Sequence, residues 1–145
     1  MRLLNHARWA TVTALALFTA GCGDDNNAPE GGIAGTYAAT EATLTIDGED
    51  TDLLASGAAL TVTLTEAGTT SGTLTVPAIL SETGTPQSFS LAGTYSYDEE
   101  DGTVTFNHAS DTFVGDIIWE VDGTQLQGTF ADTEGEIAVT LERQD

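Results

Sequence analysis

The amino-acid sequence predicts an all-β protein, a small antiparallel up-and-down β-barrel of about eight strands that occupies residues 33–145. Apolar side chains alternate with Thr, Ser and acidic side chains in most segments of this region, which is typical of strands with one buried face. Short loops rich in Gly, Asp and Glu separate these segments, and loops of that length join antiparallel neighbours. No segment repeats its apolar residues with the period of an α-helix.

The clearest β-hairpin lies in residues 88–109. An acidic turn that ends in Gly102 divides this stretch into two alternating halves, and the second half places Val104, Phe106 and His108 on one side. Because period-two patterns flank a short loop that contains glycine, the stretch predicts two antiparallel strands. The large apolar residues that share one parity in the first half are Phe89, Leu91, Tyr95 and Tyr97.

The first strand is expected in residues 33–46, with a bulge or break near its middle. Tyr37 and Ala39 share one parity, whereas Leu44 and Ile46 share the other. One extra residue in a strand would bring both pairs to the same face, as it does where barrel strands bend.

Residues 47–57 are expected to form a long connection, with a helical turn that places Leu53 and Leu54 at an open end. Pro77 is expected to end the pairing of its strand, because proline has no N–H to donate to a ladder. The strands expected after the first are 58–66, 72–80, 88–97, 103–108, 113–121, 124–131 and 136–142.

Closure of the sheet into a barrel is expected because an open sheet would leave two bare edges. The chain contains no lysine to protect such edges. A two-sheet sandwich of the immunoglobulin type is the main alternative, and the absence of long crossover segments in the sequence counts against it.

The first 21 residues predict a secretory signal. Arg2 and Arg8 precede a short stretch of apolar and small residues, and this stretch ends at the sequence Ala20-Gly21-Cys22. Residues 22–32 mix Gly, Asn, Asp and Pro without apolar periodicity, which predicts a flexible tether.

Ala20-Gly21-Cys22 resembles the lipobox of bacterial lipoproteins, apart from Thr19 in a position where that motif usually has Leu. The resemblance implies cleavage before Cys22, acylation of its thiol and a place on the periplasmic or outer side of a membrane in the bacterial cell envelope. The alternative is a chance cysteine behind an ordinary signal peptide. Cys22 is the only cysteine, so no intrachain disulfide is available to the barrel.

The charge is strongly acidic, with 23 Asp and Glu residues against three Lys and Arg residues and a formal net charge of −20. After the predicted cleavage Arg143 would be the only remaining Lys or Arg. This composition excludes nucleic acid and anionic membrane surfaces as electrostatic partners, and it favours a cationic partner or a saline habitat.

Three segments resemble bacterial lipocalin-like lipoproteins: Gly35-Thr36-Tyr37 at the first strand, residues 92–97 before an acidic turn, and residues 139–143 in the last strand. The resemblance spans nearly all of residues 33–144 and implies a barrel that binds a small ligand. Lipocalins have a Trp in the first strand beneath an Arg near the last strand. Here Tyr37 and Arg143 would take those roles and form a cation–π lid at the closed end.

Five inward residues are the candidate ligand contacts, and they either line a pocket or fill the barrel: Tyr95, Tyr97, Phe106, His108 and Trp119. Small inward residues at Ala39, Gly93 and Gly128 favour some cavity.

Catalytic chemistry is not expected. Residues 108–111 contain His, Ser and Asp, but side chains so close in sequence seldom form a catalytic triad, and no Gly-x-Ser-x-Gly motif is present. His108 is expected to be a partly buried polar residue near an end of the barrel. The acidic cluster in residues 47–52 does not follow the EF-hand order, so its carboxylates are expected to be solvated rather than bound to metal.

The sequence therefore predicts an exported, lipid-anchored barrel, without catalytic activity or cofactor, that binds a small apolar or amphipathic ligand. The alternative function is a protein-interaction or inhibitor module whose acidic loops contact a cationic partner.

Overall fold

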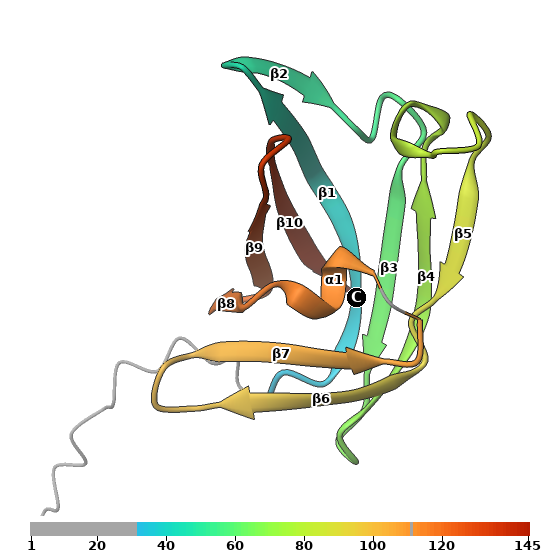
Figure 1. The fold of residues 1–145 in the computed structure, drawn as a ribbon. Helices are drawn as coiled ribbons and strands as arrows, with labels where there is room; N and C mark the ends of the chain where they lie inside the picture. The colour runs from blue at the N-terminus through green and yellow to red at the C-terminus, as the bar shows by residue number, and fades with distance from the viewer. Residues whose placement is uncertain (1–31, 111) are drawn as a thin grey trace, which may run out of the picture.

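A computed structural model describes residues 32–110 and 112–145, and in this part of the chain it shows ten strands, one 3-10 turn and one helical turn (Figure 1). These elements are β1 (Gly35–Ile46), β2 (Glu49–Asp52), β3 (Ala59–Leu64), β4 (Thr69–Val76), η1 (Ala78–Leu80), β5 (Gln87–Ser90), β6 (Gly93–Asp98), β7 (Thr103–His108), α1 (Phe113–Asp116), β8 (Trp119–Asp122), β9 (Gln125–Ala131) and β10 (Glu136–Gln144).

Eight of the strands close into a barrel, in the order β1, β3, β4, β6, β7, β8, β9 and β10, and β10 pairs with β1 to complete the ring. All neighbours are antiparallel and nearly all are consecutive along the chain, so the ring is an up-and-down meander. This confirms the predicted eight-stranded barrel and excludes the two-sheet sandwich.

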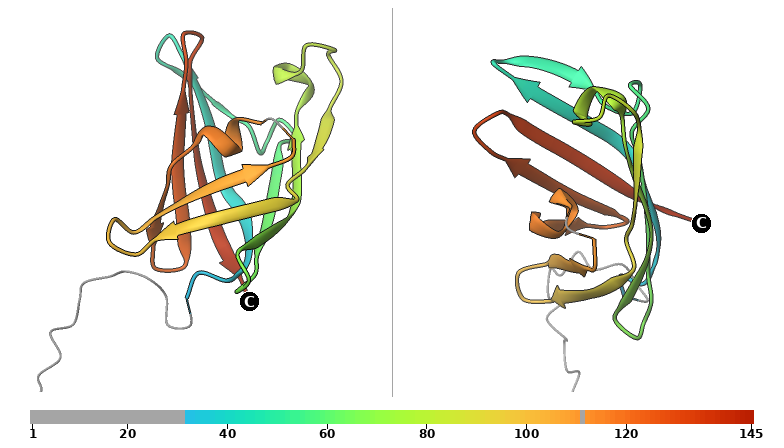
Figure 2. Two further views of the ribbon diagram at one scale, coloured as in Figure 1. Left: turned by 60° about the horizontal axis from the view of Figure 1, so that its bottom comes forward. Right: turned by 45° about the vertical axis from the view of Figure 1, so that its right-hand side comes forward.

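The two remaining strands lengthen the barrel wall at one end (Figure 2). β2 pairs with the final residues of β1, and β5 pairs with the final residues of β4. The expected single strand over 88–97 is in fact β5 and β6, separated at Leu91-Ala92, where Leu91 is fully buried. β4 pairs first with β6 and then with β5, so the two segments act as one bent strand of the wall.

β1 contains the irregularity that its sequence predicts. Its register with β10 shifts between Ala39 and Glu41. The shift brings Tyr37, Ala42 and Leu44 to the interior, where each is at least nine-tenths buried. A bulge therefore allows one long strand to change parity without turning an apolar face to solvent.

Residues 47–57 form more structure than the expected loop. Asp47 and Gly48 adopt φ values of 52° and 83° and make a two-residue hairpin turn, and β2 then runs back along β1. Positive φ at both central residues is the requirement of a type I′ turn, which Asp-Gly satisfies well. The second half of the segment forms hydrogen-bonded turns rather than a helix, and Leu53 is buried there.

The segment 113–121, expected to be a strand throughout, begins instead with α1. Val114 and Ile117 lie three positions apart and are both fully buried, which a helical turn permits and an extended strand does not. The alternation of Ile117, Trp119 and Val121 holds only from the end of this turn. Within the described ranges, neither α1 nor any other helix is long and apolar enough to cross a membrane.

α1 lies beside one of the two shortest strand pairings of the wall. β7 and β8 pair over only two positions, Thr103 with Glu120 and Val104 with Trp119. β7 pairs with β6 along one edge, and beyond Val104 its other edge faces α1 instead of a strand (Figure 1). We call this short pairing the β7–β8 seam.

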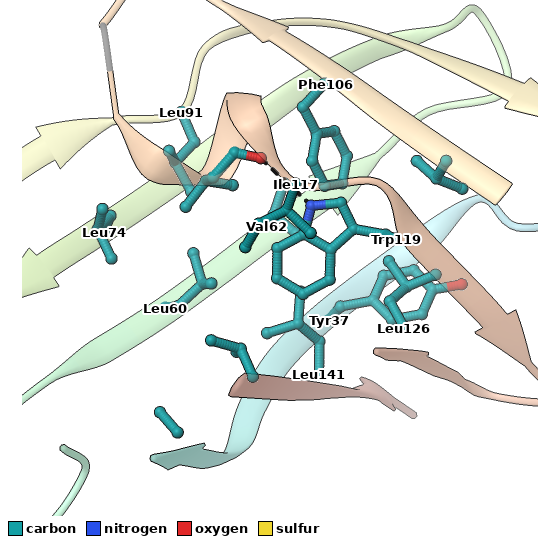
Figure 3. Close-up of a cluster of buried hydrophobic side chains, with 14 of the residues drawn as sticks. Tyr37, Leu60, Val62, Leu74, Leu91, Phe106, Ile117, Trp119, Leu126 and Leu141 are labelled. Carbon is teal, nitrogen blue, oxygen red and sulfur yellow. Dashed lines mark hydrogen bonds between the residues drawn. The ribbon is translucent and has the colours of Figure 1, made fainter. Parts of the chain in front are cut away.

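The core fills the barrel around Trp119 (Figure 3). The Trp119 side chain is completely buried, and its indole Nε1 donates a hydrogen bond of 3.2 Å to the backbone oxygen of Val114 in α1. The largest fully buried side chains that share this interior are Tyr37, Leu64, Leu91, Ile117, Leu126 and Leu141.

Gly128 is expected to be intolerant of a side chain. A Cβ placed on it would overlap Ile117 Cγ2 and lie 3.0 Å from Trp119 Cε3. We expect Gly128→Ala to lower the free energy of unfolding by about 1–3 kcal/mol, the usual cost of overpacking a core. Urea denaturation measures this difference.

Gly115→Ala is the matched control, because a Cβ at Gly115 would find its nearest neighbour, the Phe106 backbone oxygen, at 3.7 Å. We expect this variant to be as stable as the unmodified protein or slightly more stable, since Ala has the higher helix propensity. Equal losses in the two variants would contradict the packing shown for Gly128.

Candidate functional site

Three connections gather at one end of the barrel, which we call the open end (Figures 1 and 2). They are the β1–β2 hairpin with the turn that follows it, the segment of η1 between β4 and β5, and the β9–β10 turn. The opposite end contains the β6–β7 turn and the beginning of β1.

An apolar pocket enters the barrel from the open end. Its cavity volume is about 30 Å³, which is room for one or two water molecules. Thr75 is the only residue with a polar side chain among those that line it. The lining residues are Ala39, Ala42, Leu53, Leu54, Ala58, Ala59, Leu60, Leu74, Thr75, Val76, Pro77, Leu80, Phe113, Ile137 and Val139.

Alanines in the wall make this space. Ala39 and Ala42 lie on β1 and face the interior, opposite Leu141 and Val139 of β10. Ala39 was among the small inward residues that predicted a cavity, and it does line one. The other two small residues behave differently, because the space above Gly128 is taken by Ile117 and Trp119, and Gly93 lies tightly against the backbone of β7.

The pocket is closed mainly by side chains that do not belong to the strands of the ring. Leu53 and Leu54 come from the turn after β2, Leu80 from η1 and Phe113 from α1. Sequence reasoning anticipated the two leucines from their place in the connection. It missed Leu80 and Phe113, whose contribution depends on a 3-10 turn and a helical turn that carry no periodic signal.

A second hollow, the mouth groove, lies beside the pocket at the surface and offers about 130 Å³. It shares Leu80 and Ile137 with the pocket, so the two spaces adjoin. The residues that line the mouth groove are Leu44, Ile46, Leu80, Phe130, Asp132, Glu134, Gly135 and Ile137. Its floor is apolar, and its charged residues are both carboxylates.

The five predicted ligand contacts lie away from both spaces, and none of them lines either one. Trp119 and Phe106 are buried, whereas Tyr95, Tyr97 and His108 are partly buried. Three of the five come together: the Phe106 ring stacks on His108 at 5.3 Å between centroids and meets Trp119 edge-on at 6.0 Å. Their contact with a ligand stays a prediction.

The two tyrosines of β6 face inward near the other end of the barrel. The Tyr95 hydroxyl donates a hydrogen bond of 2.7 Å to the backbone oxygen of Thr65. Burial raises the pKa of Tyr95, and the nearby Glu66 carboxylate adds to this effect. Burial likewise raises the pKa of Tyr97, with smaller contributions from Glu99 and Asp98. Both phenols are therefore neutral hydrogen-bonding groups at ordinary pH.

Tyr37 and Arg143, the predicted lid, lie directly opposite each other in the β1–β10 register. The Tyr37 hydroxyl donates a 2.8 Å hydrogen bond to the Ile33 backbone oxygen, and Arg143 Nη1 donates one of 3.4 Å to that of Gly32. Burial raises the pKa of Tyr37, although the Arg143 guanidinium opposes the shift. The Arg143 side chain also passes over Gly35, where a Cβ would come within 2.6 Å of its Nε.

His108 is the least satisfied polar side chain of the described part. Both of its ring nitrogens are buried without a hydrogen-bond partner there, as is Thr112 Oγ1. Burial lowers the pKa of His108. His108 is partly buried, as expected, and its ring stacks on that of Phe106. Of the three triad candidates in residues 108–111, the aspartate lies outside the described residues.

Within residues 32–110 and 112–145 no group of three or more His, Cys, Asp or Glu side chains could hold a metal ion. The acidic residues of β2 are all exposed. Cys22, the signal segment 1–21 and nearly all of the 22–32 tether lie outside the described residues, so their predicted roles stay predictions.

The fold and the site together define a small closed antiparallel β-barrel with an apolar opening at one end. Comparisons of the chain with models of protein families, with curated proteins and with solved structures gave no match.

The buried state of His108 makes stability depend on pH. Because its pKa in the folded protein lies below the ordinary value of 6.5, the unfolded chain binds more protons as the pH falls through that value. We therefore expect the free energy of unfolding to decrease between about pH 8 and pH 5.5, above the range in which most carboxylates titrate. Urea denaturation across this range measures the slope.

His108→Phe keeps an aromatic ring on Phe106 but cannot be protonated, so we expect a flatter pH dependence from this variant. His6 is present in both proteins and cancels in the comparison. Identical slopes would show that burial of His108 does not affect its proton affinity.

Proposed function

We propose that this protein binds a small apolar or amphipathic ligand, without catalysis, and that the ligand enters the apolar pocket from the open end. The observation that carries the proposal is a space lined almost entirely by aliphatic side chains inside an otherwise well-packed barrel. Sites for small molecules are typically concave and mostly apolar, and the mouths of β-barrels are a common place for them.

The lining also indicates what the ligand is made of. Thr75 is the only polar side chain there, and its Oγ1 lies 3.3 Å from Ser88 Oγ, on the exposed side of the wall. A group that needs hydrogen bonds would lose them on entering such a pocket, at a cost of about 1–3 kcal/mol. The part of the ligand that enters is therefore an aliphatic chain, which gains about 0.8 kcal/mol per buried CH₂ group.

The pocket must widen to admit such a chain, because about 30 Å³ is less than a chain of several carbons requires. Leu54, Leu80 and Phe113 are the side chains placed to move, since each is only partly buried and comes from a turn or a short helix. Segments of this kind are more mobile than the strands they connect. Binding would displace these side chains while the wall of the ring keeps its register.

A second candidate function is contact with a cationic protein partner. Its support is a shallow hollow of about 400 Å³ on the outer wall, at β8 and β9, where Asp116 and Glu120 flank the exposed Ile118. Carboxylates around an exposed apolar side chain suit a basic partner better than an acidic one.

Decanol is the probe for the ligand proposal. We expect it to bind saturably with a Kd in the micromolar range, roughly −8 kcal/mol, as measured by titration calorimetry. We also expect a shift in Trp119 emission, because Trp119 is hydrogen-bonded to Val114, the neighbour of the pocket residue Phe113.

Ala42→Val should weaken the binding of decanol by about fourfold to fifteenfold, since the added methyl groups take the place of one or two methylene groups of the probe. Ala138→Val is the control, because Ala138 lies on β10 with its side chain exposed on the outer face. If decanol binds neither of the two variants nor the unmodified protein, the pocket is not a ligand site. The cationic-partner function then gains support.

For localisation, we propose that Cys22 is acylated and anchors the barrel to a membrane of a bacterial cell envelope, in line with the resemblance to lipocalin-like lipoproteins. The support is the sequence Ala20-Gly21-Cys22 behind an apolar stretch. A lipid anchor at the start of a tether would hold a ligand-binding barrel close to a source of aliphatic molecules.

Cys22→Ala should abolish the incorporation of labelled palmitate and release the protein from the membrane fraction. Two acyl chains are needed for stable anchoring, and the thiol carries them in the expected modification. Retention of the variant in the membrane fraction, together with an unlabelled parent protein, would refute the anchor.

A further inference from the structure

We propose that the open end selects amphiphiles with a cationic head group, such as a quaternary ammonium or an alkylamine, over neutral and anionic ones. This inference rests on the proposed function, because it assigns the head group of a ligand whose aliphatic chain occupies the apolar pocket. It follows from how the mouth groove joins that pocket and from the charges that surround the groove.

The pocket and the mouth groove lie side by side, with two side chains in common. Leu80 and Ile137 line both, so a chain that displaces these two side chains would run from the barrel interior into the groove. Ile46, which is 43% exposed, and Phe130 extend the apolar floor toward the surface. A ligand that fills this path would place its head at the outer end of the groove.

Two carboxylates stand at that outer end, Asp132 and Glu134 in the β9–β10 turn. Asp132 is fixed in place, because its Oδ1 accepts hydrogen bonds of 2.7 Å from the Glu134 backbone N–H and 3.1 Å from that of Gly135. The fixed turn presents a negative charge beside the apolar floor, and little conformational entropy is lost when a cation approaches it.

No positive charge of the open end competes for these carboxylates. Arg143 is the only Lys or Arg in the described part, and it pairs with Tyr37 near the beginning of β1, away from the open end. The connections of the open end carry further carboxylates, at Asp47, Glu49, Asp50, Asp52, Glu82 and Glu136. The resulting potential attracts a cationic head and repels a carboxylate or sulfate head.

Phe130 adds a preference for organic cations. It is partly buried, it lines the groove beside Asp132, and it packs against Phe113 of the pocket at 6.1 Å between ring centroids. An aromatic face next to carboxylates is a favourable environment for a quaternary ammonium group, because its charge is diffuse and weakly hydrated. The pocket would thus bind the aliphatic chain of the ligand, and the adjoining mouth groove would bind its head group.

The test compares three probes with the same ten-carbon chain, used below their micellar concentrations: decyltrimethylammonium, decanol and decyl sulfate. We expect titration calorimetry to give the tightest Kd for decyltrimethylammonium and the weakest for decyl sulfate. The preference for the cation should shrink as the salt concentration rises, since added ions screen partly exposed charges. A rise in melting temperature with the cation would show that it binds the folded state.

The double variant D132N/E134Q removes the two charges and keeps an Oδ1 acceptor for the turn. We expect it to lower the affinity for decyltrimethylammonium relative to that for decanol by about threefold to tenfold, as for the loss of two partly exposed ion pairs. The matched control is E99Q/E100Q, which makes the same change in net charge in the β6–β7 turn at the other end of the barrel. This control should bind all three probes as the unmodified protein does.

The possible results separate the two proposals. If decanol binds but decyltrimethylammonium binds no tighter, the charge preference is wrong and the ligand function stands. If D132N/E134Q and E99Q/E100Q lose the same fraction of cation affinity, net charge and not the mouth groove is responsible, and the inference fails. If none of the three probes binds, the ligand function fails and this inference fails with it.

Discussion

The pairing of the first strand with the last is the constraint on which the rest of the structure depends. β1 and β10 are in register from Thr36 with Gln144 to Thr45 with Glu136, and this pairing turns a meander with two free edges into a closed wall. Closure determines which face is interior, and it places Tyr37, Val139 and Leu141 around one core with Trp119. The sequence contains a single cysteine, so closure and packing hold the barrel without an intrachain disulfide. The bulge in β1 is part of the same constraint, because without it the two halves of the strand could not both face inward.

Much of the fold could be predicted from the sequence because a strand with one buried face has a strict period of two. Parity alone assigns Phe106 and Trp119 to the interior, and each is at least nine-tenths buried. β2 could not be predicted in this way, because its four residues, EDTD, are all polar and exposed and carry no alternation. It forms because the turn before it directs the chain back along β1.

The site was harder to predict than the fold, for a physical reason. Parity says which side chains point inward, but the space left between them depends on residues brought together from distant parts of the chain. The large aromatic residues near the middle of the sequence looked suited to a ligand, yet Phe106 and Trp119 pack against each other. The space lies instead beside Ala39 and Ala42, where small side chains of one strand meet the turns of the open end.

The β7–β8 seam has a consequence for how the barrel moves. Two residue pairs hold this part of the wall, so its amide protons should exchange with solvent through local opening well before those of the long β1–β10 ladder. α1 lies beside the same short pairing. Its Val114 backbone oxygen accepts the hydrogen bond from Trp119, and its Phe113 side chain lines the pocket. A chain inserted beside Phe113 would therefore change the hydrogen-exchange protection of the seam, so ligand entry and local opening of this part of the wall would be thermodynamically coupled.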